Sequence, residues 1–192
     1  MRLEFLKDNT FLRFVLKFLL LFAVFYYGTL AIIGLSVPGG YYSPFVVHYL
    51  DYISWLRSSL LNGSRWLLSL FNIETYLATE YNLKVVNGRG IKMVYECIGY
   101  GIMSFWGAFV IASAGSFIRK LAWVVFGWVF IWILNVIRLS LLLVATDRGW
   151  PMPLNWDHHT WFTIFSYLFI FICMYLFNKQ GNTIKKEKKE IS

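Results

Sequence analysis

Long apolar runs without charge constrain this chain more than any other feature of its sequence. The first run covers 11–37, and its core, 18–35, contains no charged side chain. A helix needs about 20 such residues to cross roughly 30 Å of hydrocarbon. Hydrophobic residues make up 58% of the chain and charged residues only 15%, whereas soluble domains carry about 25% charge. The sequence therefore predicts an integral membrane protein.

Three further apolar runs cover 97–116, 121–145 and 160–178. The run over 97–116 is rich in small residues, which allow transmembrane helices to approach closely. A basic start before the first run also fits a signal peptide, but such peptides have an apolar region of about 7–15 residues and a small-residue cleavage site. The first run is longer and no Ala-x-Ala pattern follows it. We therefore expect four transmembrane helices in one membrane domain, 1–192.

The segment 38–96 between the first two runs has a mixed character. Residues 45–71 alternate charged with large apolar side chains, which favours one or two amphipathic helices at the membrane interface over a fifth span. Over 83–94, Asn87-Gly88 separates two groups of β-forming residues, the pattern typical of a hairpin. The predicted fold is an all-α membrane protein with an extracytoplasmic amphipathic segment and a short β-hairpin.

The positions of the basic residues predict the orientation of the chain. With the N-terminus inside and four crossings, eleven of the 18 Lys and Arg residues lie inside and six lie in the longer outer loops, with Arg138 inside the membrane. Cytoplasmic loops carry the excess of positive charge, so we expect both termini in the cytoplasm and the protein in the cell membrane. The basic tail, 179–192, then acts as a topology anchor near the lipid bilayer. The orientation of the chain in the membrane therefore accounts for the net charge of +8, and we predict no nucleic-acid partner.

This topology brings three kinds of reactive side chain to the outer membrane edge. Cys97 opens the second apolar run, and His158 and His159 open the last one. Arg138 precedes the outer end of its run by seven residues, which is about 10 Å along a helix. We therefore expect a thiol, an imidazole and a guanidinium to meet at the outer leaflet.

Arg138 is the most informative of these residues. A guanidinium near the centre of a spanning helix costs about 2.5–3.5 kcal/mol on insertion scales, so such residues are usually functional. The alternative is an arginine that extends to the lipid headgroups. Asn135 lies three residues earlier on the same helical face, which favours a polar pair that points into the bundle.

A single membrane cysteine is usually packing material, and we interpret Cys173 in this way. Cys97 differs because the sequence predicts a strand directly before it and a helix directly after it. A thiol at a helix N-terminus gains thiolate character, as nucleophilic attack requires. Glu96 would oppose this effect unless its carboxylate points away.

The adjacent His158 and His159 follow Asp157 and allow two interpretations. With His48 they could bind a metal ion, or they could serve a haem, but adjacent histidines on a helix point in different directions. A base beside the thiol is the more economical use. We predict no metal and no cofactor.

The order of these residues resembles the exosortase/archaeosortase family. The resemblance rests on Glu96-Cys97-x-Gly99, then Asn135-x-x-Arg138, then a histidine at the start of the last span. It implies a membrane cysteine peptidase or transpeptidase that acts on membrane-anchored proteins with a carboxy-terminal sorting motif, a transmembrane helix and a basic tail.

The resemblance also implies a role for each residue. Cys97 would be the nucleophile, Arg138 the second catalytic residue and His159 the third, with His158 as the alternative and Asn135 and Glu96 in support. Thr163 lies four positions after His159, where the family commonly has glycine, and Ile98 stands where the family usually has Ser or Ala.

The substrate's helix would then dock against small residues of the second span, namely Gly101, Ser104, Gly107 and Ala108. Two other classes of function stay open. One is a non-enzymatic scaffold or small transporter in which Arg138 and Asn135 line a substrate path, and the other is a metal or haem carrier that uses the histidines.

Overall fold

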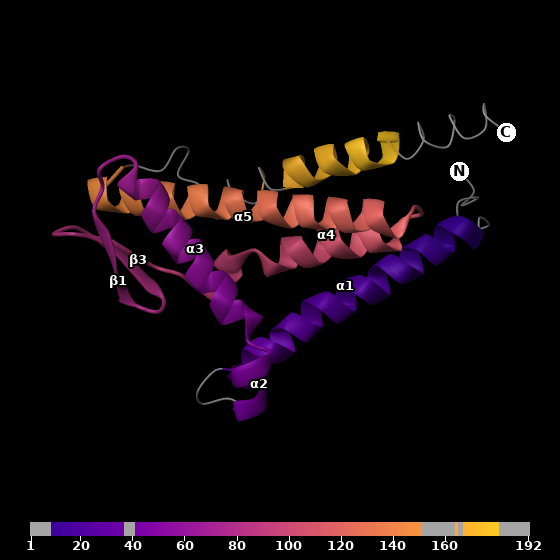
Figure 1. Ribbon diagram of the computed structural model, residues 1–192, viewed down its shortest axis with the longest axis horizontal. Coiled ribbons are helices and arrows are strands. Elements are labelled where there is room, and N and C mark those ends of the chain that lie inside the picture. The colour runs from indigo at the N-terminus through magenta and orange to yellow at the C-terminus, as the bar shows by residue number, and fades with distance from the viewer. Residues whose placement is uncertain (1–8, 37–40, 151–163, 165–166, 181–192) are drawn as a thin grey trace.

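The computed structural model describes residues 9–36, 41–150, 164 and 167–180. Within these ranges the chain is mainly helical and carries one small antiparallel sheet (Figure 1). The elements, in chain order, are α1 (Asn9–Ser36), α2 (Pro44–Tyr49), α3 (Tyr52–Ser69), β1 (Thr75–Thr79), β2 (Asn82–Val85), β3 (Gly90–Lys92), the 3-10 helix η2 (Tyr95–Ile98), α4 (Tyr100–Ala112) and α5 (Phe117–Arg148). Residues 167–180 form a further helix.

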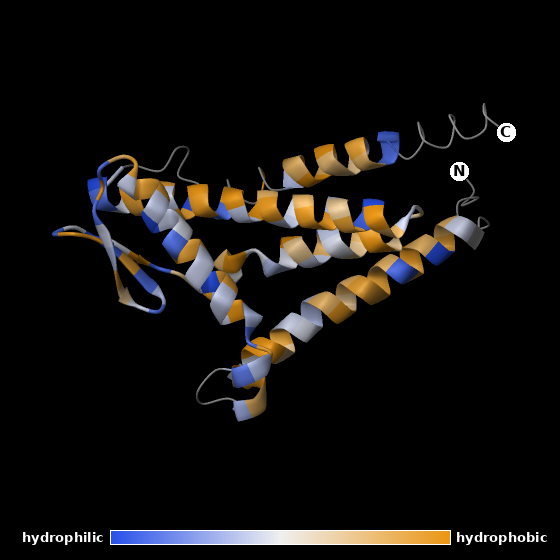
Figure 2. Ribbon diagram, viewed as in Figure 1, coloured by the Kyte–Doolittle hydropathy of each residue, from blue (hydrophilic) through white to orange (hydrophobic). Residues whose placement is uncertain are grey.

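Two of the helices are long and apolar enough to cross a membrane. Helix α1 has 28 residues and α5 has 32, so they measure about 42 Å and 48 Å. Both are apolar over most of their length, whereas α3 and the sheet are mixed (Figure 2). These two helices agree with the predicted first and third spans and are compatible with a membrane protein.

Helix α4 is shorter than the predicted second span, 97–116. It has 13 residues, or about 20 Å, because Cys97 and Ile98 belong to η2 and Gly99 interrupts the helix with a φ of 82°. Its last residue is Ala112, and α5 begins only at Phe117. The predicted fourth span, 160–178, lies partly outside the described residues, and its described part is helical over 167–178.

The amphipathic segment predicted over 45–71 forms the two helices α2 and α3. The Asp51 carboxylate accepts a hydrogen bond from the Ser54 backbone N–H at 3.0 Å and so caps the first turn of α3, which satisfies a donor that has no partner within the helix. Helix α3 buries Ile53 and Leu60 at helical spacing and leaves Trp55 and Trp66 exposed.

The sheet has three strands rather than the two of the predicted hairpin. Strands β2 and β3 pair antiparallel around the Asn87-Gly88 turn as expected, and Asn87 has a φ of 60°. Strand β1 adds to the other edge of β2, with Thr75 opposite Val85. The prediction of a hairpin alone was therefore incomplete.

The hairpin turn docks on the end of α5. The Arg89 backbone N–H donates a hydrogen bond to Asp147 Oδ1 at 2.9 Å. A side chain at Gly88 would overlap the same carboxylate, so glycine is needed there for the close approach. This contact joins the sheet to α5, the longest helix among the described residues.

The small residues of α4 lie against other helices of the chain itself. A Cβ on Gly101 would contact Tyr26 of α1 at 3.5 Å, and one on Gly107 would contact Trp128 of α5 at 3.5 Å. Ala108 is fully buried. Helices α1 and α5 therefore pack against the small residues where a substrate helix was expected to dock.

The elements are arranged with two distinct ends. The start of α1, the connection between α4 and α5, and the end of the 167–180 helix lie at one end of the molecule, and the sheet and the end of α5 lie at the other (Figure 1). Cys97 belongs to η2, which connects β3 to α4 along the chain, and Arg138 belongs to α5.

Candidate functional site

Cys97 lies in the short 3-10 helix η2 and is 4% exposed. Its backbone N–H donates to the Val94 carbonyl at 3.0 Å, and its side chain belongs to a core cluster with Met93, Ile98 and Leu139. The sequence predicted that the cysteine lies at the start of the helix that follows the strand. In the structure it lies one turn before the first residue of α4. The effect of a helix dipole falls off within the first turn, so another source of positive charge matters more here.

Arg138 supplies this positive charge. Its Nη2 donates a hydrogen bond to the Cys97 backbone oxygen at 2.6 Å, and its guanidinium lies close to the Cys97 side chain. The structure thus brings together two residues that lie 41 positions apart in the sequence.

Asn135 holds the next peptide group of the same turn. Its side chain is fully buried, and its Nδ2 donates to the Ile98 carbonyl at 3.3 Å. Asn135 and Arg138 lie on one face of α5 because they are three residues apart. Together they bind two successive carbonyl oxygens of the segment that carries the cysteine, which fixes this segment against α5.

Gly99 makes this arrangement possible. Its φ of 82° lies in the left-handed region, which residues with a side chain rarely adopt. A Cβ at this position would also come within 2.6 Å of Asn135 Nδ2. The glycine of the Glu96-Cys97-x-Gly99 pattern is therefore required by both the backbone and its neighbour.

The remaining candidates have a less complete structural description. His158 and His159 lie outside the described residues, and Glu96 is described only as part of η2. Cys173 is buried in the 167–180 helix with Phe177 and Trp106, far along the chain from the turn that carries Cys97. This location agrees with the interpretation of Cys173 as packing material.

Arg57 of α3 was not predicted from the sequence as a functional residue, yet it is only 4% exposed. Its guanidinium carbon lies 4.0 Å from the centre of the Tyr81 ring, and its Nη2 lies 3.7 Å from Glu80 Oε2. Burial and the neighbouring Tyr81 raise the pKa of Tyr95, while Arg57 lowers it. Arg57 thus joins α3 to the β1–β2 turn and to the residue two positions before Cys97.

A signal for Arg57 was present in the sequence. The buried positions of α3 include Ile53, Leu60 and Leu61, and Arg57 lies four residues from two of them. A charged residue on the apolar face of an amphipathic helix is rarely buried without a partner, so this position was a candidate for an internal contact.

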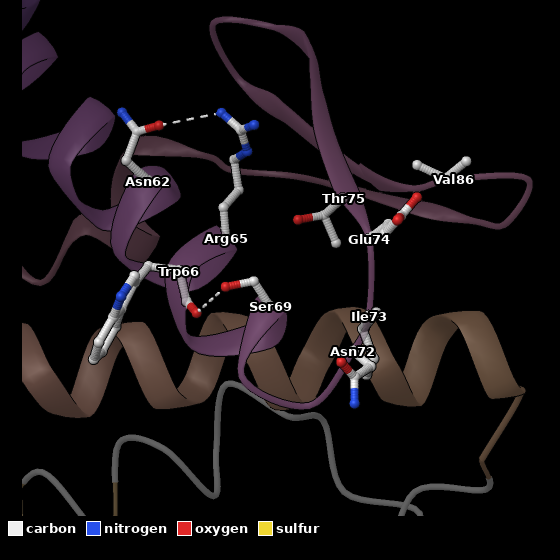
Figure 3. Close-up of a pocket in the computed structure, with 9 residues that line it drawn as sticks. All are labelled: Asn62, Arg65, Trp66, Ser69, Asn72, Ile73, Glu74, Thr75 and Val86. Atoms are coloured by element: carbon white, nitrogen blue, oxygen red, sulfur yellow. Dashed lines mark hydrogen bonds between the residues drawn. The ribbon is translucent and has the colours of Figure 1, made fainter.

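A hollow of about 690 Å³ lies between α3 and β1, away from the cysteine. Figure 3 shows Arg65 and Thr75 on opposite sides of it, with the Arg65 head directed toward Asn62. Of the predicted catalytic residues that the structure describes, Cys97 and Arg138, neither lines this hollow. Within the described ranges, no group of three or more His, Cys, Asp or Glu side chains could hold a metal ion.

The part of the chain that is described therefore offers a buried thiol beside a guanidinium, on a turn fixed by two side chains of α5. Comparison with family models, curated proteins and solved structures finds no match to this chain.

Proposed function

We propose that this protein is a membrane-embedded cysteine peptidase or transpeptidase of the exosortase type. The observation that carries the proposal is the contact between Cys97 and Arg138. The order of residues in the sequence predicts that these two side chains lie together in such an enzyme. A cysteine that served only for packing would not need a cation beside it. The substrates would be membrane-anchored proteins with a carboxy-terminal sorting motif, a transmembrane helix and a basic tail.

In the proposed reaction the Cys97 thiolate attacks the carbonyl carbon of the scissile peptide bond. The carbon–sulfur bond forms, the carbon–nitrogen bond breaks, and the amine leaves with a proton donated by His159, or by His158 in its place. Water or an acceptor nucleophile then attacks the thioester and releases the thiolate. Arg138 donates hydrogen bonds to the oxyanion, where a desolvated cation contributes most.

The proposed location is the cell membrane, with four spans, both termini in the cytoplasm and the site at the outer face. Helices α1 and α5 support this arrangement by length and composition. The excess of basic residues on the side of the chain termini supports the orientation.

Alanine substitution of each cysteine tests the proposed nucleophile. The protein is co-expressed with a candidate substrate that ends in a helix and a basic tail, and the substrate's size is followed by immunoblotting. Cys97→Ala is expected to abolish processing because no other described group replaces the thiol, whereas Cys173→Ala is the matched control and should retain it. Both variants should accumulate in the membrane at the level of the unmodified protein.

Full processing by Cys97→Ala would contradict the proposal. Arg138→Lys keeps the charge but loses the planar group that reaches both the backbone oxygen and the thiol, so processing should fall at least tenfold. A requirement for Arg138 without a requirement for Cys97 would instead favour a substrate path lined by Arg138 and Asn135.

A further inference from the structure

A groove of about 850 Å³ lies between α1, α3, α4 and α5. Its lining contains no charged side chain and is almost entirely apolar. Thr29 and Ser104 on its lining are buried, whereas Trp55, Val125 and Val129 at its margin are exposed, Trp55 by 72%. The groove therefore has a closed floor and a side that opens outward from the helices.

Most of the polar side-chain atoms that line the groove have partners within the chain. Thr29 Oγ1 donates to the Phe25 carbonyl at 2.7 Å and lies 2.5 Å from the Tyr52 hydroxyl oxygen. Ser59 Oγ donates to the Leu56 carbonyl at 2.7 Å and accepts from Trp132 Nε1 at 3.0 Å. Trp128 Nε1 donates to a backbone oxygen in the same way. The groove thus has few free donors or acceptors for a polar ligand. It suits an apolar ligand that forms no hydrogen bonds.

The groove also lies along the parts of α1 and α5 that carry no charge. Its α1 residues, Phe25 and Thr29, follow Lys17, and no Asp, Glu, Lys or Arg occurs again before Asp51. Its α5 residues, from Val125 to Trp132, lie between Lys120 and Arg138, again without a charge. If α1 and α5 cross the membrane, the opening faces hydrocarbon and not water.

The volume of the groove indicates a thin occupant. A helix with its side chains is about 10–12 Å across, so 850 Å³ accommodates only about 9 Å of helix, which is fewer than two turns. A hydrocarbon chain is much narrower and can follow the groove along its whole length. Filling the space also restores the dispersion contacts that an empty groove lacks.

We propose that this groove binds one acyl chain of a membrane lipid, which enters from the side between α1 and α5. This binding does not depend on the proposed peptidase activity. Tyr100, which lines the groove, directly follows Gly99 of the cysteine-bearing turn, so the chain would lie beside the site without taking part in its chemistry.

Photo-cross-linking from the groove tests the proposal. Met103→p-benzoylphenylalanine places the probe in the groove, and Ile111→p-benzoylphenylalanine places it on the exposed part of the same helix. The full chain is reconstituted in vesicles of phosphatidylglycerol and phosphatidylethanolamine that contain a trace of lipid with an alkyne-tagged chain. We expect Met103 to label at least fivefold more strongly than Ile111, and untagged lipid to compete only at Met103.

Ser104→Phe provides the matched variant because its ring fills the floor of the groove. The bound lipid that survives mild detergent is counted by native mass spectrometry. We expect about one lipid per chain for the unmodified protein and at least fivefold less for Ser104→Phe, while Ile111→Phe retains it. If Ser104→Phe does not fold, Val129→Phe at the margin replaces it.

Three results would overturn the assignment. They are equal labelling at Met103 and Ile111, a cross-link from Met103 to a protein helix or to a second copy of this chain, and lipid retention that Ser104→Phe leaves unchanged. Loss of substrate processing by Cys97→Ala with unchanged lipid labelling would support the groove and the peptidase independently. Unchanged processing by Cys97→Ala with strong labelling at Met103 would contradict only the peptidase.

Discussion

At the scale of single residues, the site depends on how two side chains of α5 hold one turn. Arg138 and Asn135 bind the backbone oxygens of Cys97 and Ile98, so the position of the thiol is set by contacts to its own main chain. The sequence identified Arg138, Asn135 and Cys97 because a charge and an amide in an apolar run are costly without a role. It could not identify Glu80 and Tyr81 as the partners of Arg57, because these contacts depend on where α3 and the sheet meet.

Gly99→Ala is expected to disturb the cysteine-bearing turn. The left-handed backbone costs a residue with a side chain about 1–3 kcal/mol, and the added Cβ would also displace the Asn135 amide. We expect a lower unfolding temperature in detergent micelles and slower reaction of Cys97 with a small thiol reagent. A small increase in stability would contradict this account.

The matched control for Gly99→Ala is Gly28→Ala in α1. A Cβ at Gly28 has no atom within 4 Å among the described residues, and its φ is not positive. Alanine is about 1 kcal/mol more favourable than glycine inside a helix, so this substitution should leave the unfolding temperature unchanged or raise it.

At the scale of elements, the sequence predicted the long helices better than the sheet. The ends of α1 and α5 lie within a few residues of the predicted spans, because long apolar runs set both. The hairpin was predicted from Asn87-Gly88, whose turn residues are a strong local signal. Strand β1 was missed because its pairing with β2 depends on a contact between segments that no turn motif marks.

The contact between Asp147 and the hairpin turn should hold the sheet against α5. In Asp147→Ala the Arg89 N–H loses its acceptor at 2.9 Å, and a hydrogen bond to a charged group contributes about 1.5–3 kcal/mol. We expect trypsin to cleave after Arg89 at least threefold faster in proteoliposomes. Asp147→Asn keeps an oxygen acceptor and should remain close to the unmodified protein.

An unchanged rate for Asp147→Ala would show that other contacts hold the sheet. Gly88→Ala should also accelerate cleavage, because its methyl group overlaps the Asp147 carboxylate. Combining Gly88→Ala with Asp147→Ala should accelerate cleavage by less than the sum of the two separate effects. The methyl group added at position 88 no longer overlaps a carboxylate once Asp147 is replaced.

At the scale of the whole molecule, the charge distribution predicts which end of the bundle faces the cytoplasm. The start of α1 and the turn before α5 lie together at the end opposite the sheet (Figure 1), as the predicted topology requires. Composition predicted the membrane class because 58% hydrophobic residues exceed what a small core can bury. The number of membrane crossings depends on whether α4 and the segment 160–178 each cross the membrane. The length and charge of these two segments alone do not decide this.

Impermeant maleimide labelling tests this orientation. In a background that carries Cys97→Ala and Cys173→Ala, Val86→Cys near the hairpin turn should be labelled in intact cells. Ile118→Cys at the start of α5 should be labelled only after the membrane is permeabilised. Both positions are exposed, so a difference reports sidedness. The reverse pattern would show that the chain inserts with its termini outside.

The unequal lengths of α4 and α5 have a consequence for the surrounding bilayer. At about 20 Å and 48 Å, the two neighbouring helices cannot both match one hydrocarbon thickness, and such mismatch is relieved by tilting or by local thinning of the lipid. The bilayer edge beside α4 should therefore be depressed toward the cysteine. Short-chain lipids would stabilise this shape and long-chain lipids would oppose it, which would make the proposed activity sensitive to the thickness of the host membrane.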